Sequence, residues 1–167
     1  MPPVKSTRVS QVELKEDALQ KLKKLLLTSI AYEEKIDVLR MFLVSNEIFD
    51  CYGGFCRLDR NEDGFITPLD MVDFFRDNGI TDVTEAECYF IIKYFDSDVD
   101  GKLHFTDFMQ VLLPCGPGSE EMRSDVTQRV ASGCKPDEFL TVDVEQDLSR
   151  LLKMEVDFHR EVELLKQ

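Results

Sequence analysis

The chain has 167 residues and a formal net charge of −13, with 33 acidic and 20 basic side chains. This excess of negative charge argues against a nucleic-acid partner, because backbone phosphates would repel the protein. The length allows one compact domain with helical extensions. We expect a cytoplasmic protein with no membrane span, because residues 1–6 lack the apolar core of a signal peptide and no apolar run is long enough to cross a bilayer.

Residues 1–45 are predicted to form an amphipathic helical arm. Residues 10–13 have the form of a helix N-terminal capping box, and no Gly or Pro follows them before Gly53. Mostly apolar side chains then recur at alternating spacings of four and three: Ala18, Leu22, Leu25, Ser29, Tyr32, Ile36, Leu39 and Leu43. Such a heptad seam is typical of a helix that packs along another helix, as in a coiled coil.

Residues 59–70 have the composition of a loop that holds a hard divalent cation. Oxygen-bearing side chains stand at every second position, at Asp59, Asn61 and Asp63, and Gly64 follows at the sixth position. A hard cation needs six to eight oxygens from one short segment, and glycine permits the sharp turn that brings them together. The alternation therefore predicts a cation-binding loop.

Residues 96–107 repeat this pattern with Asp96, Asp98, Asp100 and Gly101. The two loops begin 37 residues apart, about the length of one helix–loop–helix unit with its linker. Each loop is flanked by apolar residues at helical spacing: Phe55, Leu58, Leu69, Val72, Phe74, Phe75, Ile91, Tyr94, Phe95, Phe105, Phe108, Met109, Leu112 and Leu113. The spacing predicts a tandem repeat in which helices enter and leave both loops.

The ends of the flanking helices carry further signals. Ser45 and Asn46 are expected to end the arm and to cap the next helix near Glu47. Gly53 and Gly54 then fall inside that helix, at a propensity cost of roughly 2 kcal/mol relative to two alanines, and close helix packing is their expected reason. Pro68 stands where the helix after the first loop would begin, a position at which its missing N–H is harmless.

Residues 47–113 resemble the calmodulin-like EF-hand superfamily, on the strength of these two loops. The resemblance implies Ca²⁺ ligands in the first loop at Asp59, Asn61, Asp63, Phe65, Thr67 and Asp70, and in the second loop at Asp96, Asp98, Asp100, Lys102, His104 and Asp107. Phe65 and Lys102 would contribute only their backbone carbonyls. Ile66 and Leu103, at the eighth position of each loop, would join the loops through a short antiparallel bridge.

The expected fold is therefore all-α. It comprises an EF-hand pair, whose loops meet in the short β bridge, and amphipathic helices at both ends of the chain. The expected segments are an N-terminal arm at 1–45, the paired EF-hand domain at 46–114, a linker with a short helix at 115–140, and a C-terminal amphipathic helix at 141–167.

Two departures from the common EF-hand pattern bear on the choice of metal. The twelfth position is Asp70 in one loop and Asp107 in the other, where Glu is usual. Asp is one methylene shorter, so the site is smaller and closer to the six-coordinate geometry that Mg²⁺ prefers, and Mg²⁺ becomes a competitor of Ca²⁺. His104 at the ninth position is unusual as well, since an oxygen side chain or a bound water is common there. A fold that has lost useful calcium affinity remains an open alternative.

The C-terminal part is predicted to contain two more helices. Residues 114–118 are rich in Pro and Gly and are expected to interrupt the helical structure. Ser119 can then cap a short helix that runs to about Ala131, and a final helix begins near Thr141. The final helix carries a second seam at Leu148, Leu151, Glu155, Phe158, Val162 and Leu165. The two terminal seams could pack on each other, on the EF-hand groove, on another protein, or on a second copy in a homodimer.

The remaining reactive side chains point to no catalytic centre. The five cysteines, Cys51, Cys56, Cys88, Cys115 and Cys134, contain no C-x-x-C pair and are expected to be reduced thiols in packed helices. His159 is expected on the surface. A glycine-rich phosphate loop, a nucleophile elbow and a metal-hydrolase histidine pair are all absent from the sequence, so we expect a protein that is not an enzyme.

The leading functional hypothesis is a calcium-binding regulatory adaptor. Metal binding would couple to the binding of an amphipathic helix or a cytoskeletal protein. The alternative is a structural component with Mg²⁺-filled or vestigial EF-hands. The order of EF-hand pair, Leu112–Pro114 break and acidic C-terminal helix is similar to EF-hand proteins of ciliate and other protist cytoskeletons. That likeness implies an axonemal or microtubule partner and a place at the cytoskeleton or cilium. A simple calcium buffer fits poorly, because the arms would be superfluous.

Overall fold

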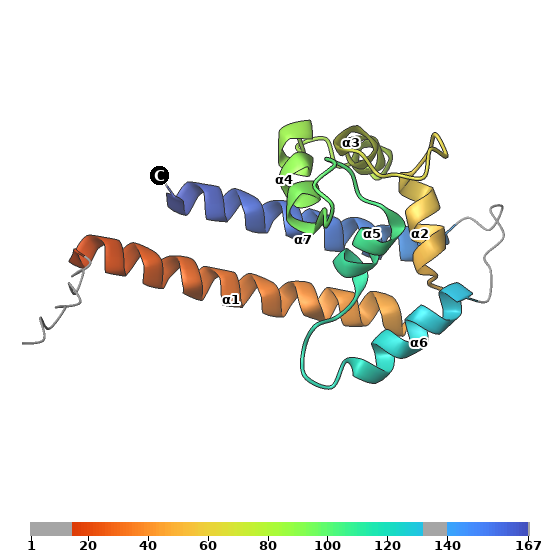
Figure 1. Ribbon diagram of the computed structural model, residues 1–167, viewed down its shortest axis with the longest axis horizontal. Coiled ribbons are helices and arrows are strands. Elements are labelled where there is room, and N and C mark those ends of the chain that lie inside the picture. The colour runs from red at the N-terminus through yellow and green to blue at the C-terminus, as the bar shows by residue number, and fades with distance from the viewer. Residues whose placement is uncertain (1–14, 132–139, 167) are drawn as a thin grey trace, which may run out of the picture.

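The fold was obtained as a computed structural model that describes residues 15–131 and 140–166. These residues form seven helices: α1 (Glu16–Ser45), α2 (Cys51–Leu58), α3 (Pro68–Asp77), α4 (Glu85–Phe95), α5 (Phe105–Leu112), α6 (Glu120–Ala131) and α7 (Val142–Lys166). Figure 1 shows α1 and α7 along the long axis of the molecule, with α3 and α4 drawn above α7 and α6 drawn below the C-terminal end of α1. The predicted all-α class is confirmed. The predicted capping box at residues 10–13 lies outside the described residues.

The two terminal helices pack against each other in antiparallel orientation (Figure 1). The ring of Tyr32 on α1 lies 5.5 Å from that of Phe158 on α7, measured between centroids. Ile36 and Leu43 on α1 and Leu148 and Leu151 on α7 are fully buried or nearly so. The seams predicted at the two ends of the chain therefore meet within one molecule.

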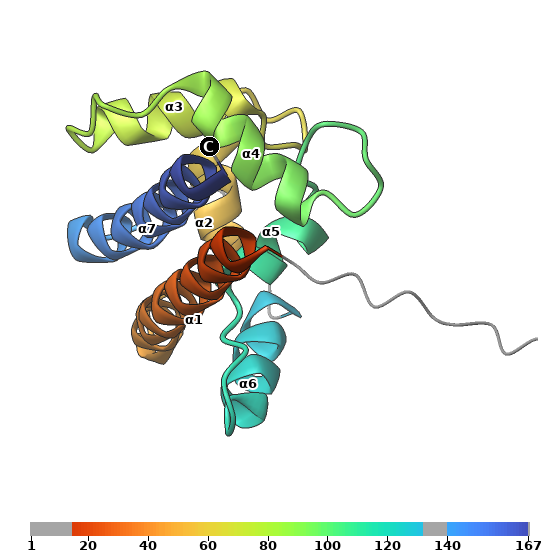
Figure 2. The same ribbon diagram turned by 90° about the vertical axis from the view of Figure 1, so that its left-hand side faces the viewer.

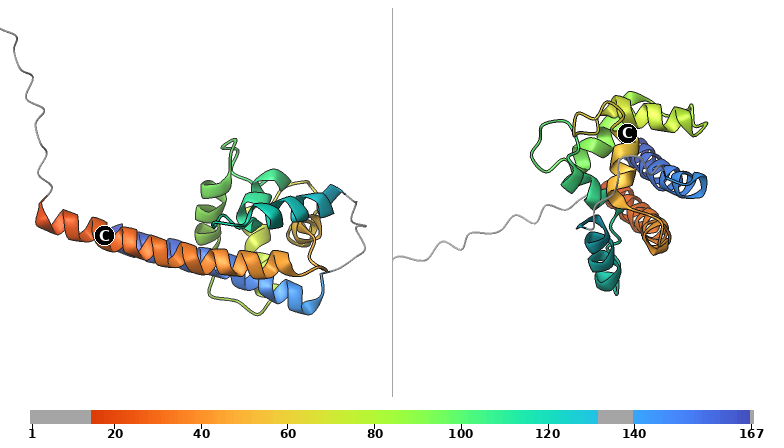
Figure 3. Two further views of the ribbon diagram at one scale, coloured as in Figure 1. Left: turned by 90° about the horizontal axis from the view of Figure 1, so that it is seen from below. Right: turned by 90° about the vertical axis from the view of Figure 1, so that its right-hand side faces the viewer.

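Only the C-terminal half of the α1 seam is used in this way. Ala18 is exposed and Leu22 keeps 43% of its surface exposed, although both belong to the predicted seam. Figure 3 shows the reason, because the N-terminal end of α1 extends past the end of α7. The first turns of the predicted seam are therefore not covered by α7. The length of α7, and not the heptad pattern of α1, decides which residues of α1 are buried.

The two helix–loop–helix units share one apolar core. The pairs α2–α3 and α4–α5 each enclose one loop, and the loops join through an antiparallel bridge between Ile66 and Leu103, both fully buried. Their backbone N–H and C=O groups form two hydrogen bonds of 2.9 Å. The largest side chains that are almost completely buried are Phe49, Phe74, Phe75, Phe108, Ile36, Leu43, Leu58, Ile66, Met71, Ile91, Ile92 and Leu103. The inter-loop bridge is present as predicted.

The second helix begins later than the sequence indicated. Its N-cap is Asp50, whose carboxylate accepts hydrogen bonds from the N–H groups of Tyr52 at 3.3 Å and Gly53 at 2.9 Å. The predicted start near Glu47 was wrong, because Asp50 satisfies the free N–H groups of the first turn. Gly54 then lies in the interior of a short helix. A Cβ built on it would stand 3.5 Å from Phe49 and 3.6 Å from Phe108, which is ordinary contact.

The C-terminal helix α7 lies across the EF-hand pair as well as along α1. Figure 2 looks along the two arms and shows α7 between α1 and the helices α3 and α4. Glu145 accepts a hydrogen bond of 2.6 Å from Arg57 on α2 and one of 3.1 Å from Asn78 at the end of α3. Arg160 forms ion pairs with Glu87 on α4 and, at 3.1 Å, with Asp82 in the α3–α4 loop. The helix α7 thus packs against both helix–loop–helix units of the same chain.

The segment between α5 and α6 is tied to α1. The carboxylate of Asp37 accepts hydrogen bonds from the backbone N–H groups of Cys115 at 2.6 Å and Gly116 at 3.0 Å. Ser119 precedes α6 as predicted, but its hydroxyl donates to the carbonyl of Pro114 at 3.1 Å. Ser119 thus stands directly before α6 and is bonded back to the preceding turn.

One buried side chain, Arg40, links three helices. Its Nη2 lies 2.8 Å from Glu155 Oε1 on α7, and its Nε donates to the carbonyl of Val111 on α5, also at 2.8 Å. Arg40 is 4% exposed and Glu155 is 2% exposed. Loss of solvation raises the pKa of Glu155 to about 7, since it outweighs the opposing effect of the Arg40 charge.

We predict that Glu155 makes the free energy of unfolding depend on pH and that the Glu155→Gln variant lacks this dependence. Because the pKa of Glu155 is raised from about 4.5 to about 7, its proton is held more tightly in the folded state. This contribution stabilises the fold below about pH 4.5 and disappears as the pH rises to about 7. The difference in unfolding free energy between natural protein and variant should fall over this range, by at most on the order of 3 kcal/mol. Urea unfolding at several pH values measures it, and a pH-independent difference would contradict the assignment.

We also predict that Gly54→Ala stabilises the protein by about 1 kcal/mol. Alanine has a higher helix propensity than glycine, and it reduces the conformational entropy of the unfolded chain. Its Cβ would meet the neighbouring side chains only at ordinary contact distances. Gly54→Leu is the matched control, since its further carbons must enter space already filled by Phe49, Phe108 and Leu148, at a cost of about 1–3 kcal/mol. Equal effects of both substitutions in thermal unfolding would show that packing at this position has been misjudged.

Candidate metal centre

The two loops lie side by side, joined by the bridge between Ile66 and Leu103. In each loop, the carboxylate of the first residue accepts equivalent hydrogen bonds from backbone N–H groups of the same loop. Asp59, the first residue of loop one, accepts hydrogen bonds from the N–H groups of Asp63 at 3.1 Å and Gly64 at 2.9 Å. Asp96, the first residue of loop two, accepts from Gly101 at 2.8 Å. Each aspartate thus folds its loop back on itself.

Backbone conformation supports the same turn in both loops. Gly64 and Gly101 have φ of 86° and 84°, a region that a residue with a Cβ enters only with strain. The fourth positions, Glu62 and Val99, also have positive φ of 56° and 62°. The prediction that glycine is required at the sixth position for a sharp turn agrees with these angles.

The inner side chains differ between the loops. In loop one Asn61 Nδ2 donates to Asp63 Oδ2 at 2.9 Å. In loop two Asp98, Asp100 and His104 form a cluster in which one ligand atom from each lies within 4.8 Å of the others. Among the described residues this is the one group of three or more His, Cys, Asp or Glu side chains with such spacing. Loop two therefore brings its acids together with an imidazole, and loop one does not.

The twelfth residues serve as helix caps. Asp70 Oδ2 accepts from Thr67 N at 2.8 Å and from Thr67 Oγ1 at 2.5 Å, which closes the first turn of α3. Asp107 Oδ2 accepts from His104 N at 3.2 Å, while its Oδ1 accepts from Ser97 Oγ at 2.6 Å. Asp107 is only 3% exposed. The carboxylate of Asp107 has both oxygens engaged by protein groups.

The clustered acids of loop two have perturbed acidities. Partial loss of solvation raises the pKa of Asp98, and a shared hydrogen bond with Asp96 and the charge of Asp100 act in the same direction. Loss of solvation also acts on Asp96, but backbone N–H donors from Gly101 and Val99 outweigh it and lower the pKa of Asp96. Asp98 thus gains most from a nearby positive charge.

The residue set fits a hard divalent cation. Each loop presents side-chain oxygens at its first, third, fifth and twelfth positions, and carboxylate and amide oxygens are what Ca²⁺ and Mg²⁺ take. A shallow hollow of about 420 Å³ lies over loop two, lined by residues that include Gly64, Ser97, Asp98 and His104. Ser97 was missed as a functional residue, because the second loop position carries no sequence signal. Its contact with Asp107 requires the folded loop.

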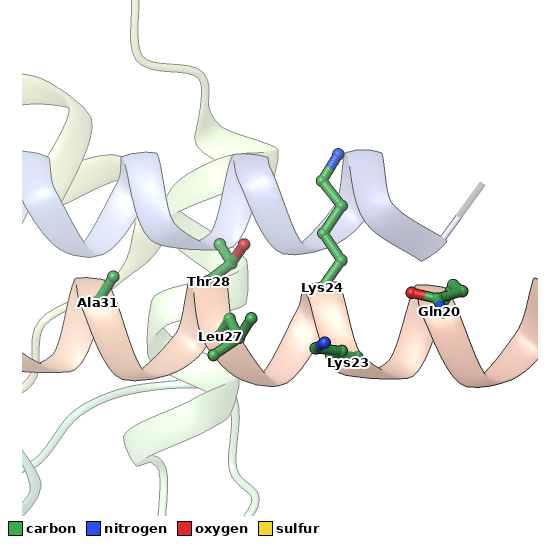
Figure 4. A pocket seen from close by; sticks show the side chains of 6 residues that line it. All are labelled: Gln20, Lys23, Lys24, Leu27, Thr28 and Ala31. Atoms are coloured by element: carbon green, nitrogen blue, oxygen red, sulfur yellow. The ribbon is translucent and has the colours of Figure 1, made fainter.

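A second hollow, on the surface of α1, has a different character. Figure 4 shows its lining residues, Gln20, Lys23, Lys24, Leu27, Thr28 and Ala31, with Lys24 and Thr28 pointing toward α7. Lysine ammonium groups are donors without acceptor capacity, and this lining contains no acid. The hollow therefore offers a basic and apolar surface and no cation site.

The cysteines and His159 lie apart from the loops' inner positions. Cys51 and Cys88 are buried free thiols in helices, and burial raises the pKa of each to about 12. Cys115 is exposed in the segment before α6, which differs from the expected packed position, and Cys134 lies outside the described residues. His159 was expected on the surface, but its ring packs 5.8 Å from that of Tyr94, and burial lowers its pKa.

Comparisons with known proteins bear on the loops and their flanking helices. The family model described as an EF-hand domain pair matches residues 48–113, from the residue before Phe49 to the end of the second unit. Neither the comparison with curated proteins nor the one with solved structures found a match. Over the part of the chain that the structure describes, no helix is both long and apolar enough to cross a membrane.

We predict that Asp70→Glu raises the preference of loop one for Ca²⁺ over Mg²⁺. The longer side chain can bind Ca²⁺ through both oxygens, which favours the larger, seven-coordinate ion. The expected gain is about tenfold in Ca²⁺ affinity, with Mg²⁺ affinity unchanged or lower. Calorimetric titration measures both.

Asp107→Glu is the matched comparison in loop two. Its carboxylate is buried and bonded to Ser97, so the extra methylene must displace a packed group. We expect a smaller gain there together with a loss of thermal stability. Equal gains in both loops would contradict the view that Asp107 is fixed by its neighbours.

Proposed function

Residues 48–113 of this chain are an EF-hand domain pair, and from that premise we propose that the protein is a calcium-binding regulatory adaptor. Occupancy of the two loops by Ca²⁺ would be coupled to the binding of a helical or cytoskeletal protein. The ligands are Asp59, Asn61, Asp63, Thr67 and Asp70 with the carbonyl of Phe65, and Asp96, Asp98, Asp100 and Asp107 with His104 and the carbonyl of Lys102. The bound ion neutralises clustered carboxylates, while the chain's own residues position it and transmit its effect.

The observation that carries this proposal is the position of α7. It packs against α4, and its Glu145 accepts a hydrogen bond from Arg57 on α2, so it contacts the helices that lead into both loops. Leu148 lies near Gly54 on α2, and Arg160 pairs with Glu87 on α4. A change in the angle between the helices of a unit must therefore change the contacts of α7. This gives the loops a mechanical connection to the arms.

A second connection runs from loop two through α5. Asp107 caps the start of this helix, and the carbonyl of Val111 near its end accepts the hydrogen bond from Arg40. Arg40 in turn holds Glu155 on α7. Movement of α5 on metal binding would stretch these buried bonds, and an unsatisfied buried charge costs several kcal/mol. The relative positions of α1 and α7 would then depend on whether loop two holds an ion.

The uncovered part of α1 supports a protein partner. From Ala18 to Tyr32 the helix carries three lysines and no acid, although the whole chain has a net charge of −13. Large apolar side chains are exposed along this stretch: Leu19, Leu22, Leu26, Leu27 and Ile30. An exposed apolar surface with one sign of charge suits an acidic amphipathic helix of a partner protein. A second copy of the chain would present acids too, and sedimentation of the purified protein separates these cases.

A structural role is the second candidate function, and the twelfth loop positions favour it. Because the twelfth position is Asp in both loops, Mg²⁺ at cellular concentration could fill the loops constitutively. Alternatively, the loops could bind no ion. The arms would then serve assembly at a cytoskeletal or ciliary structure without a calcium response. Both candidates are non-enzymatic, and both place the protein in the cytoplasm, at the cytoskeleton or cilium.

We predict that metal-free protein binds two Ca²⁺ ions in calorimetric titration, and that binding survives millimolar Mg²⁺ in at least one loop. Asp59→Ala and Asp96→Ala should each remove one site, because each removes the first ligand and the bonds that shape its loop. Glu85→Ala, an exposed acid on α4 outside the loops, is the matched charge control and should change neither. Titration heat that Mg²⁺ abolishes completely would move the assignment to the structural role.

The coupling is measured on the same samples. Hydrogen exchange of α7 and fluorescence of an apolar dye should both change when Ca²⁺ is added to the natural protein. Neither should change in the double variant Asp59→Ala/Asp96→Ala. An α7 that exchanges at the same rate with and without bound Ca²⁺ would contradict the adaptor.

A further inference from the structure

We propose that loop two also takes a borderline-soft transition-metal ion of the Zn²⁺ class, bound by Asp98, Asp100 and His104, while loop one is restricted to Ca²⁺ and Mg²⁺. This inference rests on the proposed function in one respect, since it takes loop two to be a metal site. It adds that the two loops select different ions. The argument uses the geometry of the cluster, the chemistry of imidazole and the contacts that orient the ring.

Distances within the cluster match a small tetrahedral site. His104 Nε2 lies 3.3 Å from Asp100 Oδ2 and 3.5 Å from Asp98 Oδ2. Zinc binds nitrogen and oxygen at about 2.0–2.2 Å, so two ligand atoms of a tetrahedral site stand about 3.4 Å apart. The observed separations therefore leave room for one such ion between the imidazole and each carboxylate.

Hydrogen bonding alone is a weaker explanation of the same geometry. Most N–H···O hydrogen bonds in proteins have donor–acceptor distances of about 2.7–3.2 Å, and charge-assisted bonds are shorter. Both distances from His104 Nε2 are longer than this range. The ring nitrogen forms a long hydrogen bond with Asp100 and faces a second acid, Asp98, at 3.5 Å, so it stands within reach of two carboxylates at once.

The chemistry of the ninth position separates the two loops. Imidazole is a ligand for Zn²⁺, Cu²⁺ and Ni²⁺, whereas Ca²⁺ and Mg²⁺ take oxygen. Loop one has Thr67 where loop two has His104, and Asn61 where loop two has Asp98. Thr67 is also occupied by its bond to Asp70. Of the two loops, only loop two therefore combines an imidazole nitrogen with two carboxylates.

Neighbouring side chains hold the imidazole in place and leave it accessible. The ring of Phe65, from loop one, meets the His104 ring edge-on with centroids 4.8 Å apart, and Lys102 Nζ lies 4.3 Å from the centre of the Phe65 ring. The side chains of His104 and Asp100 are each 37% exposed. An ion can enter from solvent, and a water molecule can complete its fourth position.

The twelfth residue does not need to take part. Asp107 is buried and both of its oxygens accept hydrogen bonds from protein groups. A Ca²⁺ ion in loop two requires that carboxylate to turn toward it, whereas a three-ligand Zn²⁺ site does not. Loop two can therefore bind the smaller ion without disturbing the cap of α5.

The test is Zn²⁺ titration of the metal-free, full-length protein under reducing conditions, with two variants that receive the same new residue. His104→Gln removes the imidazole and keeps an oxygen at the ninth position. Thr67→Gln makes the corresponding change in loop one. We expect His104→Gln to weaken Zn²⁺ binding at least tenfold and Thr67→Gln to leave it unchanged. Asp98→Asn, which replaces one of the two carboxylates by an amide, should also weaken it.

Cobalt(II) provides the second readout, because its visible absorption reports ligand type and geometry. Bands of a tetrahedral nitrogen–oxygen site that vanish in His104→Gln would support the proposal. A thiolate-to-cobalt charge-transfer band, or Zn²⁺ binding that is equal in all variants, would place the ion on cysteines and overturn it.

Calcium titration of the same samples keeps the two proposals apart. Ca²⁺ binding at both loops with His104-independent Zn²⁺ binding would overturn this inference and leave the adaptor intact. His104-dependent Zn²⁺ binding without any Ca²⁺ response would support the inference and overturn the adaptor.

Discussion

The arrangement of the helices depends on one buried guanidinium group. Arg40 reaches from α1 to a carbonyl on α5 and to a carboxylate on α7, so it is bonded at once to the EF-hand pair and to both arms. A buried arginine must keep its partners, because leaving its charge unpaired in the interior costs several kcal/mol. These bonds therefore fix the relative positions of three helices, and any movement of α5 acts on the junction of α1 and α7.

The second constraint is the coupling between the two loops. Two backbone hydrogen bonds between Ile66 and Leu103 tie them together at the point where each exit helix begins. Phe65 extends this contact from loop one to the imidazole of loop two. The two loops are therefore joined both by backbone bonds and by a side-chain contact. The two loops are similar in sequence, but the contacts of their inner side chains differ in the folded protein.

The distribution of charge and apolar surface completes this arrangement. Acids gather in the loops, whereas the stretch of α1 from Ala18 to Tyr32 has lysines and exposed leucines. The projecting end of α1 extends past the end of α7 (Figure 3), and Leu19, Leu22 and Leu26 are exposed on it. The acidic loops and this apolar stretch lie on different elements, and the buried bonds of Arg40 join α1, α5 and α7.

Local patterns in the sequence were enough to determine the loops, their flanking helices and the bridge, because the ligands of such a loop lie within twelve residues and glycine marks the turn. The periodic apolar residues likewise determined two helical arms. Only the tertiary structure decided which part of each seam is covered. The contacts of Arg40 span 71 and 115 residues, and no local pattern encodes partners that far apart. The start of α2 at Asp50, the bond from Ser97 to Asp107 and the placing of His104 between two acids were settled in the same way, by side chains that meet only after the backbone has folded.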